Sequence, residues 1–144
     1  KGAVVDVRTG QLVGDRLRVP TPQPSVPREV VAVMDGLVRR LVAPWSPSES
    51  DGFPVGVGIP AASRNGTTLT AANLDSGWIG FPAEQELGLA MRRTVAAGND
   101  ADVAGLAEIR FGAGRDQTGL VFVLTIGTGI GTARFIDGRL VPNT

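Results

Sequence analysis

The sequence predicts an α/β protein in which helices cover a mixed or parallel sheet. Short apolar segments typical of strands alternate along the chain with longer segments whose apolar residues recur at helical spacing. Twenty glycines and ten prolines indicate many turns, and a hydrophobic fraction of 42% is too high for a disordered chain. At 144 residues the chain is long enough for one domain with a core, or for parts of two.

The first predicted elements are a β-hairpin and a helix. Two extended segments, Gly2–Val7 and Gln11–Val19, flank a short turn with Gly10 at the position where φ is expected to be positive. Four prolines then prevent regular structure until Arg28, and Ser25 is the expected N-cap of the following helix. The apolar residues at helical spacing in this helix are Val30, Val31, Val33, Met34, Leu37, Val38, Leu41 and Val42.

The middle of the chain contains short strands and turns before a second helix. Residues 44–53 are expected to form a polar loop. The segment Pro54–Pro60 predicts a buried strand, and its glycines suggest that another group packs or binds closely against its end. Asn65-Gly66 predicts a hairpin turn that leads into an extended segment at 67–71. A helix is predicted over Pro82–Met91, with the proline in its first turn.

The last part of the chain is predicted to contain three strands and a helix. A short strand at Arg93–Ala97 precedes a helix at Ala101–Phe111. The unbroken apolar run Leu120–Ile126 is typical of a strand that is buried on both faces and lies in the middle of a sheet. After a glycine-rich turn, a further strand at Ala133–Ile136 ends at Asp137-Gly138, a dipeptide typical of a type I′ hairpin turn.

Composition and charge exclude several classes of function. Fourteen basic and fourteen acidic side chains cancel, so no overall field attracts nucleic acid or an anionic membrane, and we expect neither as a partner. The absence of Cys and His removes disulfides, thiol nucleophiles, imidazole bases and the usual zinc ligands, so no metal site is predicted and acid–base chemistry must use carboxylates. No long apolar run or signal-peptide pattern occurs, and a cytoplasmic protein is expected.

Asp100 is the strongest candidate for a catalytic residue. It follows a predicted strand and begins a predicted helix, and the positive end of a helix dipole favours a negative charge there. The alternative is that Asp100 is only a helix N-cap, since Asp is a preferred residue at that position. Asn99 beside it is, by the same argument, either a turn residue or a ligand-binding group.

Two other stretches contain candidate binding residues. Gly127, Thr128 and Gly129 form part of a turn whose backbone N–H groups and hydroxyl could hold a phosphate, although a hairpin turn without a ligand explains the same residues. Asn73 and Asp75 either form Asx turns or bind a polyhydroxylated ligand, and the nearby Trp78 is more often a core residue than a stacking platform.

Three of these segments, taken together, resemble one family. They are TAANLDSGWIG (Thr70–Gly80), NDADVAGLAE (Asn99–Glu108) and LTIGTGIGTARFIDGRLVPNT (Leu124–Thr144). In this order they are similar to the bacterial sugar kinases of the ROK family, particularly the actinobacterial polyphosphate glucokinases. The resemblance implies the actin-like ATPase, or ribonuclease-H-like, sugar kinase fold, with the sugar and phosphoryl donor between two lobes. Residues 1–98 would belong to the N-terminal lobe and residues 99–144 to the start of the C-terminal lobe.

The resemblance also implies roles for individual residues. Asp100 matches the family's general base, which takes the proton from the sugar 6-hydroxyl, and Asn73 and Asn99 match sugar ligands. Ala61 stands where the family usually has the glycine of a Pro-Gly pair that contacts the sugar through its backbone. Gly127, Thr128 and Gly129 match the second phosphate loop. Glucose as the acceptor, polyphosphate or ATP as the donor, Mg²⁺ as cofactor and a homodimer in the intact protein are implied in the same way.

The comparison with the family pattern also predicts what this chain lacks. The first phosphate loop, of Asp-x-Gly-Gly-Thr type, is expected before Lys1, and a Glu-x-Gly-His segment with further sugar ligands is expected after Thr144. We therefore expect the 144-residue chain alone to be inactive, with apolar faces of Leu120–Ile126 and Val103–Phe111 left uncovered. Two other functions stay open: a sugar-responsive transcriptional regulator of the same family, and a sugar-binding module without turnover.

Overall fold

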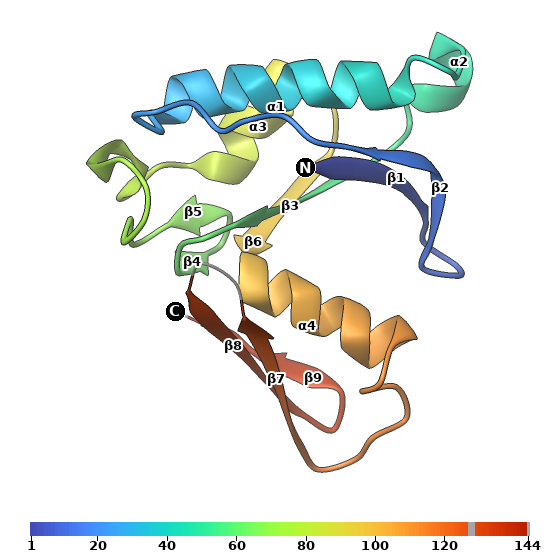
Figure 1. Cartoon of the computed structure of the whole chain (residues 1–144), viewed down its shortest axis with the longest axis vertical. Coiled ribbons are helices and arrows are strands. Elements are labelled where there is room, and N and C mark those ends of the chain that lie inside the picture. The colour runs from blue at the N-terminus through green and yellow to red at the C-terminus, as the bar shows by residue number, and fades with distance from the viewer. Residues whose placement is uncertain (127–128, 144) are drawn as a thin grey trace.

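The computed structural model describes residues 1–126 and 129–143. It is a mixed α/β structure, as the sequence predicts (Figure 1). None of the helices in the described residues is long and apolar enough to cross a membrane. The helices are α1 (Pro27–Val42), α2 (Pro47–Ser50), α3 (Ala83–Met91), α4 (Asp100–Phe111) and the 3₁₀ helix η1 (Ser76–Trp78). The strands are β1 (Gly2–Asp6), β2 (Gln11–Leu17), β3 (Val55–Ile59), β4 (Ser63–Arg64), β5 (Thr67–Thr68), β6 (Val95–Asn99), β7 (Leu120–Ile126), β8 (Ile130–Ile136) and β9 (Arg139–Val141).

The predicted hairpins are confirmed. Strands β1 and β2 pair antiparallel, and Gly10 in the turn between them has a φ of +74°. Strands β4 and β5 pair around Asn65-Gly66, and β8 and β9 pair around Asp137-Gly138. All four residues of these two dipeptides have positive φ, as a type I′ turn requires. Local turn chemistry therefore determines these three connections.

The start of α1 differs from the prediction. The N-cap is Val26, not Ser25, and it makes no side-chain capping hydrogen bond. Ser25 is buried because it is bonded to a segment far along the chain: its hydroxyl accepts from the backbone N–H of Asp75 at 3.1 Å. Its carbonyl accepts from the indole Nε1–H of Trp78 at 2.7 Å. The Ser25 side chain therefore makes a tertiary hydrogen bond instead of the helix cap that the sequence pattern predicted.

The main core lies between α1, α3 and the parallel pair β3–β6 (Figure 1). Trp78, with an exposed fraction of 1%, packs edge-on against Phe81 at a centroid distance of 5.1 Å, so its interpretation as a core residue is confirmed. In the described residues β3 pairs only with β6 and β1 only with β2. The buried residues of this core are Val30, Val57, Ile59, Ala61, Trp78, Ala83, Leu87, Met91 and Val95.

Several boundaries differ from the sequence interpretation, and two of these differences have a local physical reason. The segment predicted as a polar loop at 44–53 contains the short helix α2. Glu49 stabilises its first turn, because the Glu49 carboxylate accepts hydrogen bonds from the backbone N–H of Ser46 at 3.0 Å and from the Ser46 hydroxyl at 2.6 Å. These bonds lower the pKa of Glu49. Strand β6 begins at Val95 instead of Arg93, because α3 ends with Arg92 in a left-handed conformation and the chain needs two residues to enter the sheet.

The prediction that Leu120–Ile126 is a central strand buried on both faces is wrong. In the described residues the sheet order is β7-β8-β9, so β7 is an edge strand. Its side chains alternate, because only one face of the strand packs toward α4. Leu120 and Phe122 on the other face have exposed fractions of 61% and 58%. The expectation that this apolar face is uncovered is confirmed, and the alternation is typical of an antiparallel sheet with one covered face.

Helix α4 lies between the β3–β6 pair and the β7–β9 sheet, and it contacts both (Figure 1). Its extent agrees with the prediction to within one residue. The expectation that the apolar residues of Val103–Phe111 are uncovered is confirmed, since Val103, Leu106 and Phe111 are exposed. The buried residues of the helix are Ala101, Asp102 and Gly105.

The exposed apolar face of β7 and β8 predicts self-association of the 144-residue chain. This face consists of Leu120, Phe122, Leu124, Ile126, Ile130 and Ile136. Burial of such a patch between copies removes apolar surface from water. The double variant Phe122→Lys/Leu124→Lys should therefore sediment more as a monomer than the wild-type chain, whereas Val7→Lys, on an exposed residue of the β1–β2 turn, should not. A monomeric wild-type chain at high concentration would contradict this expectation.

Candidate active site at the ends of β3 and β6

Asn99 connects the end of β6 with the start of α4. It is the last residue of the strand and the N-cap of the helix, and its Oδ1 accepts hydrogen bonds from the backbone N–H groups of Ala101 and Asp102, each at 3.1 Å. Its Nδ2 donates to the carbonyl of Ala61 at 3.1 Å. The interpretation of Asp100 as the N-cap is therefore wrong, because the neighbouring Asn99 caps the helix.

Asp100 is the first residue of α4, and it is exposed. Its Oδ1 accepts from the backbone N–H of Ala101 at 2.9 Å, a bond to its own neighbour that leaves the rest of the carboxylate facing outward. Gly58 explains how this turn approaches the sheet, since a Cβ there would lie 3.2 Å from the Asp100 Cα. The expectation that another group packs closely against the end of β3 is thereby confirmed at Gly58, and that group is the first turn of α4; a Cβ at Gly56 would meet nothing within 4 Å.

Three predicted site residues meet at one edge of the β3–β6 pair. The strands are parallel, with Ile59 opposite Asn99, so Ala61 follows the carboxyl end of one strand just where Asn99 and Asp100 follow the other. Ligands of α/β sheets bind outside the carboxyl ends of the strands. Both backbone polar groups of Ala61 are bonded within the chain, its N–H to Ile59 at 2.8 Å and its carbonyl to Asn99. Its contact with a sugar stays a prediction.

Leu69 and Thr70, which precede Asn73 in the chain, are hydrogen-bonded to Ala62, close to the edge where β3 and β6 end. The backbone N–H of Ala62 donates to the Thr70 hydroxyl at 2.9 Å, and Leu69 donates to the Ala62 carbonyl at 2.7 Å. Asn73 itself is exposed in a turn, and in the described part of the chain no hydrogen bond joins its side chain to Asn99 or Asp100. The structure therefore does not bring Asn73 into direct contact with the other predicted site residues.

Asp75 has a structural role in this segment. Its Oδ1 accepts from the backbone N–H of Gly77 at 2.8 Å and so caps η1. Of the two roles that the sequence left open for Asp75, the turn-forming one is confirmed.

The predicted phosphate loop lies mostly outside the described residues. Gly127 and Thr128 are not described, and Gly129 is the residue before β8. The strands on either side pair up to Ile126 opposite Ile130. At Gly131 a Cβ would lie 2.8 Å from the Ala101 Cβ and 2.4 Å from the Thr125 Oγ1. Glycine at this position therefore lets β7 and β8 lie directly against the residue that follows Asp100.

Sequence reasoning missed one acidic residue at the site, Asp102. Its carboxylate is buried in the first turn of α4 and accepts two hydrogen bonds from Asn143. The available signal was the small residues Ala101 and Gly105, which lie at helical spacing and mark a closely packed face. The larger apolar residues Val103 and Leu106 lie on the exposed face of the helix, so apolar spacing alone does not indicate the buried face.

The side chains near the candidate site could bind Mg²⁺ only together with ligands from a substrate. No group of three or more Asp, Glu, His or Cys side chains gathers among residues 1–126 and 129–143 in a way that could hold a metal. Mg²⁺ is commonly bound by one or two carboxylates together with substrate phosphates. These residues therefore fit Mg²⁺ that arrives with a phosphorylated donor, and they do not fit a cage made by the protein alone.

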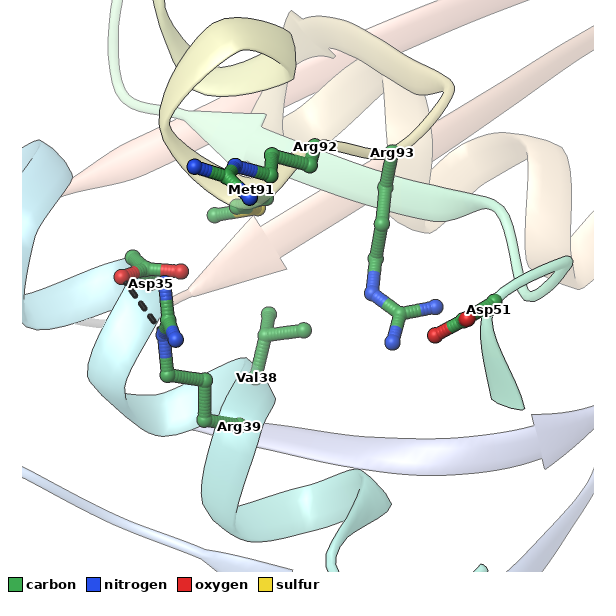
Figure 2. Close-up of a pocket in the computed structure, with 7 residues that line it drawn as sticks. All are labelled: Asp35, Val38, Arg39, Asp51, Met91, Arg92 and Arg93. Atoms are coloured by element: carbon green, nitrogen blue, oxygen red, sulfur yellow. Dashed lines mark hydrogen bonds and ion pairs between the residues drawn. The ribbon is translucent and has the colours of Figure 1, made fainter. Parts of the chain in front are cut away.

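A separate pocket of about 320 Å³ lies at the other end of β6 (Figure 2). It contains three arginines, but Arg39 is paired with Asp35 at 2.9 Å. The side chain of Arg93 extends toward Asp51, and its guanidinium donates to the carbonyls of Ser50 and Phe53. Arg39 thus forms an ion pair within α1, and Arg93 joins the residues before β6 to the connection between α2 and β3. The residues that line the pocket are Asp35, Val38, Arg39, Asp51, Met91, Arg92 and Arg93.

Asn99→Ala should destabilise the protein. The substitution removes the cap of α4, which typically costs about 1 kcal/mol, and leaves the carbonyl of the buried Ala61 without its donor, which costs about 1–3 kcal/mol more. Asn73→Ala, the same change at an exposed residue, should alter stability by less than about 0.5 kcal/mol. Urea denaturation measures both, and equal midpoints for the two variants would contradict the connecting role of Asn99.

Comparison with known proteins finds similar sequences and similar structures. The chain is 44% identical over its whole length to the polyphosphate glucokinase of Mycobacterium tuberculosis, of which it covers 52%. The inorganic polyphosphate/ATP-glucomannokinase of Arthrobacter sp. strain KM matches 99% of the chain with a TM-score of 0.92 and 44% identity, and the chain covers 56% of it. A ROK family glucokinase from Streptomyces griseus, solved with glucose and AMPPNP, matches 96% with a TM-score of 0.77 and 29% identity, and 41% of it is covered.

The chain thus spans about half the length of the relatives it matches. The predicted fold class, the actin-like ATPase fold of sugar kinases, is confirmed by these structural neighbours. The ROK family model matches residues 2–142, and the chain belongs to the ROK family.

Proposed function

We propose that this chain is part of a glucokinase that transfers a phosphoryl group from polyphosphate, ATP or both to the 6-hydroxyl of glucose. The assignment of a kinase activity is supported by two relatives, which are named as a polyphosphate glucokinase and an inorganic polyphosphate/ATP-glucomannokinase. The observation that carries the proposal is the exposed carboxylate of Asp100 at the start of α4, on the edge where parallel strands β3 and β6 end. Residues 1–98 and 99–144 would then face the substrates from two lobes.

Asp100 would act as the general base. The 6-hydroxyl of the sugar gives its proton to the carboxylate while its oxygen forms a bond to the transferred phosphorus, and the bond from phosphorus to the donor's bridging oxygen breaks. Phosphoryl transfer depends on positioning and charge stabilisation more than on covalent chemistry. One exposed carboxylate at the positive end of a twelve-residue helix is therefore a sufficient base.

The sugar would be held beside this carboxylate by amide groups. The Nδ2 of Asn99 carries two N–H donors, and the Ala61 carbonyl takes one of them. The second N–H would bond a sugar hydroxyl, and Asn73 would contribute another polar group from the turn before η1. Ala61 would support the site mainly by holding Asn99 in this orientation.

The phosphoryl donor would bind at Gly127, Thr128 and Gly129, the turn between β7 and β8. Backbone N–H groups in glycine-rich turns bind phosphate oxygens, and such donors stabilise the charge that moves during transfer. Mg²⁺ would come with the donor phosphates and neutralise part of their charge. This position is consistent with Gly131, which seats the β7–β8 pair against Ala101, the neighbour of the proposed base.

The two alternatives are less well supported. A sugar-responsive regulator shares the family, but relatives that are 42% and 44% identical to this chain carry the names of kinases. A sugar-binding module without turnover needs no base, whereas this chain keeps an exposed carboxylate at the matching position.

In the full-length protein, Asp100→Asn should lower turnover by about 10²-fold to 10⁴-fold, the usual contribution of a general base. Glucose binding should change little, because the amide keeps the shape of the carboxylate and removes only its basicity. A coupled assay with glucose and either donor, combined with calorimetric titration of glucose, separates the two effects. Asp15→Asn, on an exposed residue of β2, is the matched control. Wild-type turnover in Asp100→Asn would rule out the proposed base.

Thr128→Val should raise the Michaelis constant for the phosphoryl donor more than that for glucose. The substitution deletes a hydroxyl from the proposed phosphate turn and leaves the side-chain volume nearly constant. Initial-rate kinetics with each substrate varied in turn measure the effect, with Thr118→Val in the exposed loop before β7 as the control. An increase confined to the glucose constant would reverse the assignment of this turn.

A further inference from the structure

Asp102 is a buried acid that the proposed reaction does not use. Its exposed fraction is 5%, and both of its carboxylate oxygens accept hydrogen bonds from one residue near the end of the chain. Oδ2 accepts from the backbone N–H of Asn143 at 2.9 Å, and Oδ1 accepts from the Asn143 Nδ2 at 2.8 Å. The same Nδ2 donates to the backbone carbonyl of Thr132 in β8. The Asp102 carboxylate therefore joins helix α4 to the segment after β9, and Asn143 in that segment joins both to β8.

The chemistry of this group is unusual for a residue with only a packing role. A buried carboxylate is costly unless hydrogen bonds replace its lost hydration. The ion pairs in the described residues join Arg8 to Asp6, Arg39 to Asp35 and Arg115 to Asp116, so Asp102 depends on the neutral donors of Asn143. Because hydrogen bonds to a charged acceptor are strong and directional, this arrangement fixes a geometry that apolar packing would leave looser.

That geometry connects the two halves of the proposed site. Residues two apart on a helix point to different sides, so the first turn of α4 exposes Asp100 and buries Asp102. On the buried side, Ala101 lies against Gly131 of β8, one residue before Thr132. The turn that carries the exposed carboxylate is thus seated on the β7–β8 pair by close packing and by the Asp102–Asn143 hydrogen bonds.

We propose that Asp102 is a positioning residue: through Asn143 and Thr132 it holds the first turn of α4, and with it the Asp100 carboxylate, in a fixed place relative to β7 and β8. The inference rests on the proposed function, because it assigns Asp102 an effect on catalysis only through Asp100. A displacement of about 1 Å in a reacting group can cost about 100-fold in rate. In this proposal Asp102 acts on the substrates only through the position of Asp100.

The kinetic test is a double-mutant cycle in the full-length protein. Asp102→Asn keeps the size of the side chain but sets an amide N–H₂ against the Asn143 donors, and it should lower kcat about 10-fold to 100-fold while glucose affinity changes less than about twofold. In an Asp100→Asn background the same change should lower kcat less than about twofold, since a displaced base no longer matters. An equal loss in both backgrounds would mean a general structural role and would overturn the proposal.

A structural readout tests the same contact without activity. In Asp102→Asn, backbone amides of Ala101–Val103 should exchange hydrogen about tenfold faster, whereas those at the other end of α4 should be unchanged. Unchanged exchange in the first turn would overturn the proposal. Asp116→Asn, an exposed aspartate in the loop after α4, is the matched control for both measurements and should change neither.

A second variant covers the case in which Asp102→Asn does not fold. Asn143→Ser leaves the backbone N–H that binds Oδ2 and replaces the side-chain carboxamide, with its Nδ2 donor, by a shorter hydroxyl, so it should give a smaller fall in kcat that again vanishes in the Asp100→Asn background. A fall of the same size in both backgrounds overturns the proposal here as well. If the full-length protein phosphorylates no glucose, the proposed function fails, and hydrogen exchange still decides whether Asp102 holds the turn.

Discussion

The side chain of Asn99 makes the hydrogen bonds on which the arrangement of the site depends. Its oxygen caps α4, and its amide nitrogen bonds the Ala61 carbonyl beyond the end of β3. Strand β6 can therefore pass into a helix without an intervening loop, and the first turn of that helix stays next to the end of the neighbouring parallel strand. Without this side chain, the N–H groups at the start of α4 would have to find water or another acceptor, and the position of Asp100 would be less well defined.

Small residues allow α4 to contact two sheets at once. On one side, Gly58 of β3 leaves room for the Asp100 backbone, and on the other, Gly105 of the helix leaves room for Ala133 and Phe135 of β8, both fully buried. A Cβ at Gly105 would lie 2.7 Å from the ring of Phe135, so even alanine would push the helix away. Close packing transmits such a shift along the whole helix, because protein interiors have few voids to absorb it.

This chain has no His or Cys, and its carboxylates serve several different roles. The environment of each carboxylate determines which role it has. Asp100 and Asp102 lie two residues apart in one helical turn, yet the first is exposed at the proposed site and the second is buried and hydrogen-bonded. Asp75 caps a 3₁₀ helix, and Asp35 pairs with Arg39 at the far pocket. Residue type alone therefore says little about role, since each carboxylate takes its role from the donors around it.

The sequence by itself determined the features that depend on neighbouring residues. Asn65-Gly66 and Asp137-Gly138 adopt the positive φ values that their turns need, and apolar spacing predicted α1, α3 and α4 because periodicity is a local property. The family pattern marked Asn99 and Asp100 as candidate site residues, and the structure shows that they lie at the edge where β3 and β6 end. Tertiary structure alone decided the roles of Ser25, bonded to residues about fifty positions away, and of Asp102, bonded to Asn143. It also decided that, among the described residues, β7 pairs with β8 alone and has one uncovered face, because the burial of a strand depends on which elements pack against it, and its own residues do not encode that.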